Sequence, residues 1–155
     1  MAYNSIIVKC FTKIQEEYTA TAVAIKPGYL LEMASATTVQ AHSTAAGNAL
    51  PMFAFEDELQ GRGIDTDYAV STRIQCLIPR RGDIIYAYLA DGENASVGDF
   101  LESASAGALQ VHVADEASAG AAIVDAAIIG QALEAVDLSN SNNLTALGRI
   151  LVRII

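Results

Sequence analysis

The residue types that bind metals or attack substrates are few in this sequence and lie far apart. Its cysteines and histidines, Cys10, Cys76, His42 and His112, could together supply four zinc ligands. Zinc sites are usually built from ligands paired at short spacing, and these four residues are not paired in that way. Two buried thiols are therefore the favoured interpretation, and a disulfide between Cys10 and Cys76 stays open as the alternative.

Carboxylates offer a second kind of chemistry. Asp65 and Asp67 flank Thr66, and closely spaced hard oxygens suit calcium, but a full ligand loop does not follow them. Arg81-Gly82-Asp83 spells an adhesion tripeptide, although its place after Pro79 predicts a turn between strands. The sequence contains no nucleophile elbow, no phosphate-binding glycine loop with lysine and no paired-histidine helix motif. We therefore expect no catalytic, metal-binding or cofactor-binding residues, no cofactor and no enzymatic activity.

Composition narrows the class of protein further. With 155 residues, 52% of them hydrophobic, the chain can fold into one domain with a core of its own. The formal net charge of −9 is uneven, because residues 82–148 contain no Lys or Arg while acidic residues recur through them. Phosphate backbones would be repelled there, so we expect no direct nucleic-acid binding. No apolar run approaches the roughly 18 residues that span a bilayer, so we expect no membrane contact.

The acidic half has two interpretations that stay open. It is either a solvated, solubilising surface, or one acidic end of a molecule whose less acidic end faces a partner.

Hydrophobic alternation and β-branched residues predict strands along the chain. The clearest is Ile84–Leu89, which is too apolar for either face to be fully wet. The other predicted strands cover residues 5–14, 18–26, 29–34, 37–39, 50–55, 69–78, 97–102, 109–114, 127–137 and 148–155. Residues 15–17 are predicted as a polar break and residues 56–61 as one helical turn. Alanine favours a helix within 116–130, so helix and strand both stay open there.

A short motif, Gly-x-x-Leu-Glu, begins at Gly28, Gly98 and Gly130, with a looser copy at Gly82. Glycine permits a tight chain reversal, and a strand then leaves it. Irregular spacing argues against a solenoid. The many short strands joined by glycine turns predict an all-β protein, with at most one or two short helices, built as a small β-barrel. We expect a single domain in which an N-terminal arm or strand (1–14) precedes the barrel (15–155).

Four segments, taken in order, carry a resemblance to a known family. They are residues 55–68 (FEDELQGRGIDTDY), 81–83 (RGD), 97–103 (VGDFLES) and 129–135 (IGQALEA). Over roughly residues 50–140 the chain resembles head decoration (cement) proteins of tailed bacteriophages, which have a β-tulip or lambda-decoration-like barrel. The acidic, Ala/Gly/Ser-rich composition is similar too. The chain departs from the family in being longer than its smallest members and in lacking a Pro-rich N-terminal arm of the lambda type.

The resemblance implies a protein that binds the outside of an expanded icosahedral shell as a homotrimer and reinforces it against internal DNA pressure. Its implied partners are the major capsid protein and copies of itself. It would be made in the host bacterial cytoplasm and reside on the capsid exterior of the virion. The family offers no enzymatic residues to carry over.

Two sets of residues are predicted to make these contacts. The N-terminal strand can add to a coat-protein sheet, and its predicted contact residues are Tyr3, Ile6, Ile7, Val8 and Lys9. Alternation along residues 5–14 predicts one inward face, formed by Ile6, Val8, Cys10, Thr12 and Ile14. Trimer or core packing is predicted for Ile84, Tyr86, Tyr88 and Phe100.

Two alternative functions stay open. One is another virion structural role, such as a head-fibre base, a tail tube or a minor coat subunit. The other is a barrel that binds a carbohydrate or small ligand, in which Tyr86 and Tyr88 would stack on a sugar, or a hydrolase of unfamiliar type.

Overall fold

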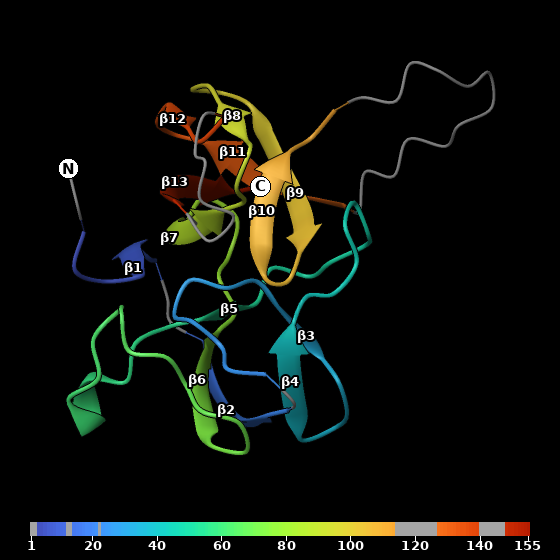
Figure 1. Cartoon of the computed structure of the whole chain (residues 1–155). Helices are drawn as coiled ribbons and strands as arrows, with labels where there is room; N and C mark the ends of the chain where they lie inside the picture. The colour runs from blue at the N-terminus through green and yellow to red at the C-terminus, as the bar shows by residue number, and fades with distance from the viewer. Residues whose placement is uncertain (1–2, 12–13, 22, 114–126, 140–147) are drawn as a thin grey trace.

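The protein is built almost entirely from short β-strands, as the computed structural model shows for residues 3–11, 14–21, 23–113, 127–139 and 148–155 (Figure 1). The strands are β1 (Ile7–Lys9), β2 (Gln15–Ala20), β3 (Leu31–Met33), β4 (Thr38–Ala41), β5 (Phe53–Ala54), β6 (Arg73–Leu77), β7 (Ile84–Leu89), β8 (Asn94–Ala95), β9 (Phe100–Ser105), β10 (Ala108–Val111), β11 (Ile128–Ala132), β12 (Val136–Asp137) and β13 (Gly148–Ile154). One 3₁₀ turn, η1 (Glu58–Gln60), ends at Gly61, whose φ is 70°. The all-β prediction and the predicted helical turn are confirmed.

The upper half of Figure 1 is a closed β-barrel. In the described part of the chain its order is β7-β10-β9-β11-β13, and pairing of β13 with β7 closes the ring. Strands β1 and β10 share the other edge of β7, β1 at its start and β10 at its end. The predicted β-barrel is therefore confirmed.

Alternation along the barrel strands explains its core. On β7, Ile85, Ala87 and Leu89 are fully buried, while the residues between them are half-buried on the outer face. On β13 the inward residues are Ile150, Val152 and Ile154. The prediction that Ile84–Leu89 has no fully wet face is confirmed.

The lower half of Figure 1 is an open sheet with the order β3-β4-β2-β6-β5. Its own cluster of buried residues includes Ile25, Val39 and Tyr68. On β6 the inward residues Ile74 and Cys76 are fully buried, and Arg73 is exposed. Burial raises the pKa of the Cys76 thiol to about 12, so this cysteine stays protonated.

Strand β5 and the residues paired with it join the two halves. Leu30 and Phe53 form a bridge and are buried in the barrel core. Their neighbours Leu31 and Ala54 are buried in the core of the open sheet. Successive residues on a strand point to opposite faces, so one short segment contributes to both cores.

The N-terminal region differs from its prediction. Residues 5–14 do not form one alternating strand, because β1 covers only Ile7–Lys9 and a bulge shifts its register against β7. Ile6 is fully buried, but Ile14 is exposed, and Thr12 lies outside the described residues. The predicted polar break at 15–17 is also wrong. These residues begin β2, where Glu17 accepts hydrogen bonds from Arg73 and Gln75 of the neighbouring strand.

The predicted strand at 127–137 is divided into β11 and β12, since residues 133–135 turn between them. Residues 116–126 of the helix-or-strand alternative lie outside the described part of the chain. Gly28, Gly82 and Gly98 have φ values of 98°, 94° and 99°, as expected for turns. Gly130 instead lies inside β11, where a Cβ atom would meet the Val152 side chain and the Arg153 carbonyl oxygen at 2.6 Å. This glycine is needed for close strand packing, not for a reversal.

Candidate functional site

The outer face of β7 and β13 gathers most of the residues predicted for packing. Ile84, Tyr86 and Tyr88 point outward from β7 and are half-buried, whereas Phe100, at the start of β9, is 45% exposed. None of the four belongs to the buried cluster inside the barrel. Their predicted place in a trimer interface stays a prediction.

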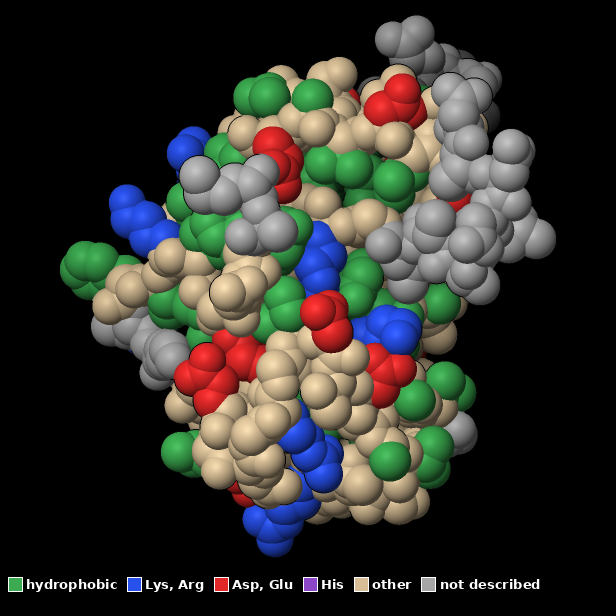
Figure 2. All heavy atoms as spheres, turned by 60° about the vertical axis from the view of Figure 1, so that its left-hand side comes forward, with side chains coloured by type: hydrophobic (Ala, Val, Ile, Leu, Met, Phe, Trp, Pro, Cys, Tyr) green, Lys and Arg blue, Asp and Glu red, His purple; other side chains and the backbone are tan. Residues whose placement is uncertain are grey.

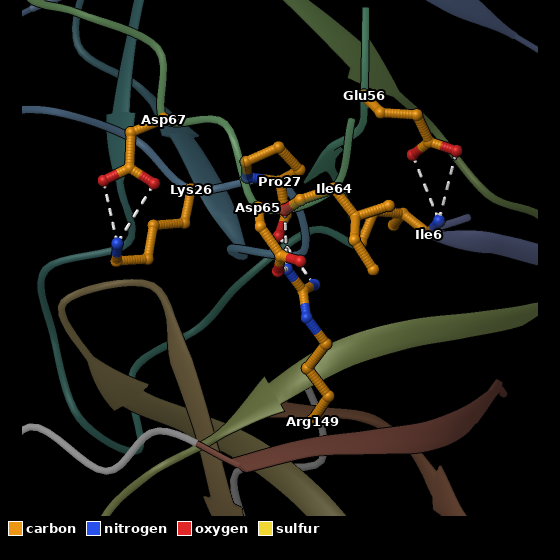
Figure 3. A network of polar contacts seen from close by, with 8 residues as sticks. All are labelled: Ile6, Lys26, Pro27, Glu56, Ile64, Asp65, Asp67 and Arg149. Carbon is orange, nitrogen blue, oxygen red and sulfur yellow. Dashed lines mark hydrogen bonds and ion pairs between the residues drawn. The ribbon is translucent and has the colours of Figure 1, made fainter. Parts of the chain in front are cut away.

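At one end of this face the open-sheet half packs against the barrel, and Arg149 makes the contact between them (Figure 3). Arg149 lies on β13 directly opposite Tyr88 of β7, and its guanidinium carbon is 4.2 Å from the centre of the Tyr88 ring. It donates hydrogen bonds to the carbonyl oxygens of Pro27, at 2.9 Å, and Ile64, at 2.6 Å. The side chain is only 9% exposed. Carbonyls and an aromatic face therefore satisfy a cation that would otherwise be costly to bury.

The tyrosines around Arg149 complete this contact. The Tyr88 ring packs edge-on against Tyr29, and the Tyr86 ring against Tyr3, at centroid distances of 5.4 and 5.3 Å. Burial raises the pKa of Tyr88, and the opposing effect of Arg149 does not cancel it. The phenol therefore stays neutral at physiological pH. Tyr3, one of the predicted coat contacts, is thus involved in contacts within its own chain.

The turn at residues 26–28 determines how closely the halves approach. Gly28 has a φ of 98°, and a Cβ atom there would lie 2.8 Å from Arg149 Nη1 and 3.1 Å from the Tyr86 carbonyl oxygen. Only glycine fits this approach without displacement. The chain reversal expected at Gly28 is confirmed, and the reason for its glycine is a contact distant in sequence.

The acidic pair considered for calcium is used for ion pairing. Asp67 pairs with Lys26 at 2.8 Å, and Asp65 approaches Arg149 at 3.4 Å (Figure 3). The two carboxylates therefore serve different cations. Among the described residues no three metal-binding side chains come together.

The N-terminal strand is anchored to its own chain. The Ile6 amide donates to the Glu56 carboxylate at 3.0 Å (Figure 3), and the Ser5 hydroxyl donates to the same group. Ile6 is fully buried, whereas Ile7 and Val8 are half-buried and Lys9 is exposed. Of the five residues predicted to touch a coat protein, Lys9 is the most available in this conformation.

Asp83 organises the turn that leads into β7. Its carboxylate accepts hydrogen bonds from the amides of Arg80, at 2.8 Å, and Phe11, at 2.9 Å, and from the Cys10 thiol, at 3.3 Å. Burial tends to raise the pKa of Asp83, but the amide hydrogen bonds outweigh it and lower the pKa. The Arg81-Gly82-Asp83 segment is thus a turn, as predicted. Cys10 contacts Asp83 and forms no disulfide with Cys76.

Sequence reasoning considered His42 only as a metal ligand and missed its actual contacts. Its Nδ1 lies 2.8 Å from the Ser103 hydroxyl, and its Nε2 lies 3.3 Å from the Asn48 carbonyl oxygen and 3.6 Å from the Glu32 carboxylate. A hydroxyl, an imidazole and a carboxylate are the components of a hydrolytic triad, but Ser103 is fully buried and its oxygen also accepts the Ser105 amide. The cluster joins the end of β4 to β9 and presents no accessible nucleophile.

Comparison with solved structures finds a similar fold, whereas comparisons with family models and with curated sequences find no match. No family model matches the chain, and no curated protein matches its sequence. Among solved structures it is similar to the crystal structure of the head fiber gp8.5 N base of bacteriophage phi29. The TM-score is 0.56 at 11% sequence identity, and the match covers 93% of this chain and 95% of that chain. At this identity the similarity is one of fold.

Proposed function

We propose that this chain is a structural protein of a bacteriophage head and that it binds the outer surface of the shell. The observation that carries the proposal is the shared fold with a head fibre base, which extends over nearly the whole of both chains. The sequence resemblance to head decoration proteins points to the same kind of surface. Fold alone does not determine function, so the chemistry of the surface has to be compatible as well.

The contacts of the described side chains support a binding role. His42 and Ser103 are buried together, Asp83 binds backbone amides, and Asp65 and Asp67 pair with cations. Groups used in this way hold the fold together, and we take the protein to act by binding and not by catalysis, without a cofactor. Its partners under this proposal are the major capsid protein and further copies of the chain.

The finer proposal is a cement protein that binds as a homotrimer and stabilises the shell. Purified heads that lack the protein would be mixed with the purified chain and sedimented. In a second experiment, heads with and without the added chain would be heated until they disrupt. We expect co-sedimentation and a higher disruption temperature of the decorated heads, because many copies stabilise many capsomer joints together. Light scattering after size exclusion should give the mass of a trimer. A chain that stays in the supernatant at every concentration would rule out the shell as its partner.

The base of a head fibre is the second candidate, and the name of the similar structure favours it. Such a base would bind the heads without raising their disruption temperature. Cryo-electron microscopy of decorated heads would then show a projection continuing outward from each bound copy. A smooth cap at each binding position would support the cement role.

A further inference from the structure

The outer face of the barrel carries a lateral row of residues that the register of its strands places side by side. Lys9 of β1 pairs with Ile84 of β7, Ile84 pairs with Arg153 of β13, and Arg153 pairs with Gln131 of β11. Laterally paired residues point to the same face of a sheet, and Lys9 and Arg153 are exposed there. Two cations therefore flank the half-buried side chain of Ile84.

The turn before β7 extends this row with further basic and apolar side chains. Lys9, Phe11 and Arg81 line a shallow surface hollow of about 250 Å³. The Gly82 amide donates to the Ile154 carbonyl oxygen at 2.8 Å, which brings the end of β13 against the turn. The Phe11 side chain is 91% exposed, and that of Ile155 is 43% exposed. We call the set Lys9, Phe11, Arg81, Ile84, Arg153 and Ile155 the basic patch. Figure 2 shows basic side chains beside hydrophobic ones toward one margin of the barrel half.

The cations of the basic patch differ from three of the described cations outside it, while Arg62 lies over the Tyr68 ring. Lys26, Arg73 and Arg149 each form an ion pair with a carboxylate. Among the described residues, no ion pair involves Lys9, Arg81 or Arg153. The carboxylate near them, Asp83, points its oxygens at backbone amides. The patch is thus a concentrated positive surface on a chain whose net charge is −9.

We propose that this protein binds an acidic protein surface of the shell through the basic patch. The partner surface would carry carboxylates around an apolar depression that receives Phe11. The inference rests on the proposed function and names the face and the chemistry of that contact. Complementary charges steer an encounter and fix its orientation. A chain of net charge −9 is repelled overall by an acidic partner, and an orientation that presents this patch reduces the repulsion.

Two other occupants fit the patch less well. Surfaces that bind nucleic acid are usually strongly basic, whereas this chain has an isoelectric point near 4.5 and an exposed phenylalanine beside Lys9 and Arg81. A second copy would have to supply carboxylates, but many of the described ones are engaged within their own chain. Glu17, Asp65 and Asp67 pair with cations, and further carboxylates accept backbone amides, namely those of Glu93, Asp99 and Glu134. A foreign acidic surface is therefore the occupant that the charges favour.

The test uses two double charge reversals with the same net charge. Arg81→Glu with Arg153→Glu changes the patch, and Arg62→Glu with Arg73→Glu changes a distant surface and serves as the control. Phe11→Ser is a third variant, which removes the exposed ring without changing charge. Circular dichroism and thermal melting first establish that each variant is folded. Binding to purified heads that lack the protein is then measured between 50 mM and 500 mM NaCl.

We expect the patch reversal to weaken binding at 50 mM NaCl by roughly tenfold or more and to reduce its salt dependence, whereas the control binds like the unaltered chain. Phe11→Ser should weaken binding at both salt concentrations. Equal binding by all variants would overturn the proposal. If the patch reversal dissociates the oligomer but still binds heads, the patch binds a second copy and the proposal is wrong. If the unaltered chain binds duplex DNA and the patch reversal does not, the patch binds nucleic acid and the proposal is also wrong. If the unaltered chain itself ignores the heads, the proposed function fails first, and the inference with it.

Discussion

Arg149 and Arg153 lie on the same outward face of β13, four residues apart, and their surroundings are opposite. Arg149 is 9% exposed, is stacked on Tyr88 and donates to two carbonyl oxygens. Arg153 is exposed, and its partners across the sheet are Ile84 and Gln131. The difference comes from what lies above them, because the turns at residues 26–28 and 63–66 cover the first arginine and leave the second open.

The comparison teaches that one strand face can serve two purposes. Where the open sheet packs against the barrel, a buried arginine joins the two halves through backbone carbonyls. Burying that charge is tolerated because its donors are used. Beyond the covering turns, Arg153 is exposed and can contact another molecule. The four predictions below test this division, from the largest expected effect to the smallest.

Arg149→Met should destabilise the fold by about 2–3 kcal/mol, because the Pro27 and Ile64 carbonyl oxygens lose their donor in a partly buried place. Arg153→Met should change stability by no more than about 0.5 kcal/mol, as is usual for exposed positions. Urea unfolding at equal m-values measures both. Similar losses in the two variants would contradict the division of the strand face.

Gly28→Ala should cost about 2–3 kcal/mol, since the new Cβ atom adds a clash with Arg149 and with the Tyr86 carbonyl to an unfavourable φ of 98°. Gly82→Ala is the matched control. Its φ is 94°, but nothing lies within 4 Å of the added atom, so only the backbone strain of about 1–2 kcal/mol remains. Thermal or urea unfolding compares them, and an equal loss would show that close approach at Gly28 does not matter.

Asp83→Asn should destabilise the chain by about 1–2 kcal/mol at pH 7, because the carboxylate that receives the Arg80 and Phe11 amides is lost. The pKa of Asp83 is lowered in the folded state. Its contribution is therefore complete above the unfolded value of about 3.9 and declines as the pH falls through the folded value. Unfolding curves from pH 7 to pH 2 should show the two proteins converging in acid. Asp99→Asn, at a half-exposed turn, should cost less.

Lys26→Gln should have the smallest effect, under about 1 kcal/mol, because its pair with Asp67 is partly exposed on both sides. The loss should disappear in 1 M NaCl, where surface charges are screened. Urea unfolding at two salt concentrations measures it. A loss as large and salt-independent as that of Arg149→Met would mean that the Lys26 pair, and not Arg149, holds the halves together.

The sequence was informative where one strand or turn determines its own structure. The apolar run of β7 and the turn glycines Gly28, Gly82 and Gly98 could be predicted because alternation and φ preferences act locally. The contacts of Arg149 could not, since its acceptors are backbone carbonyls 122 and 85 residues away in the sequence. Every residue has a backbone carbonyl, so the sequence does not indicate which of them accepts a hydrogen bond from Arg149.

The errors in the N-terminal region have a similar origin. The bulge between Ile7 and Lys9 breaks the alternation that the prediction assumed, and bulges depend on the neighbouring strand. Gln15 and Glu17 look like a break because they are polar, yet they are the exposed positions of β2. An exposed strand face with cross-strand partners therefore cannot be told from a loop by polarity alone.

Closure of the barrel by β13 has a consequence for the order in which the molecule can form. β13 is the last described strand to leave a ribosome, yet it supplies one wall of the barrel and the arginine that joins the open sheet to it. Until then β7 and β11 have unpaired edges, which other chains can join. Pairing strands so distant in sequence is slow, so we expect the pairing of β13 to limit how fast the barrel closes and how long its open edges can aggregate.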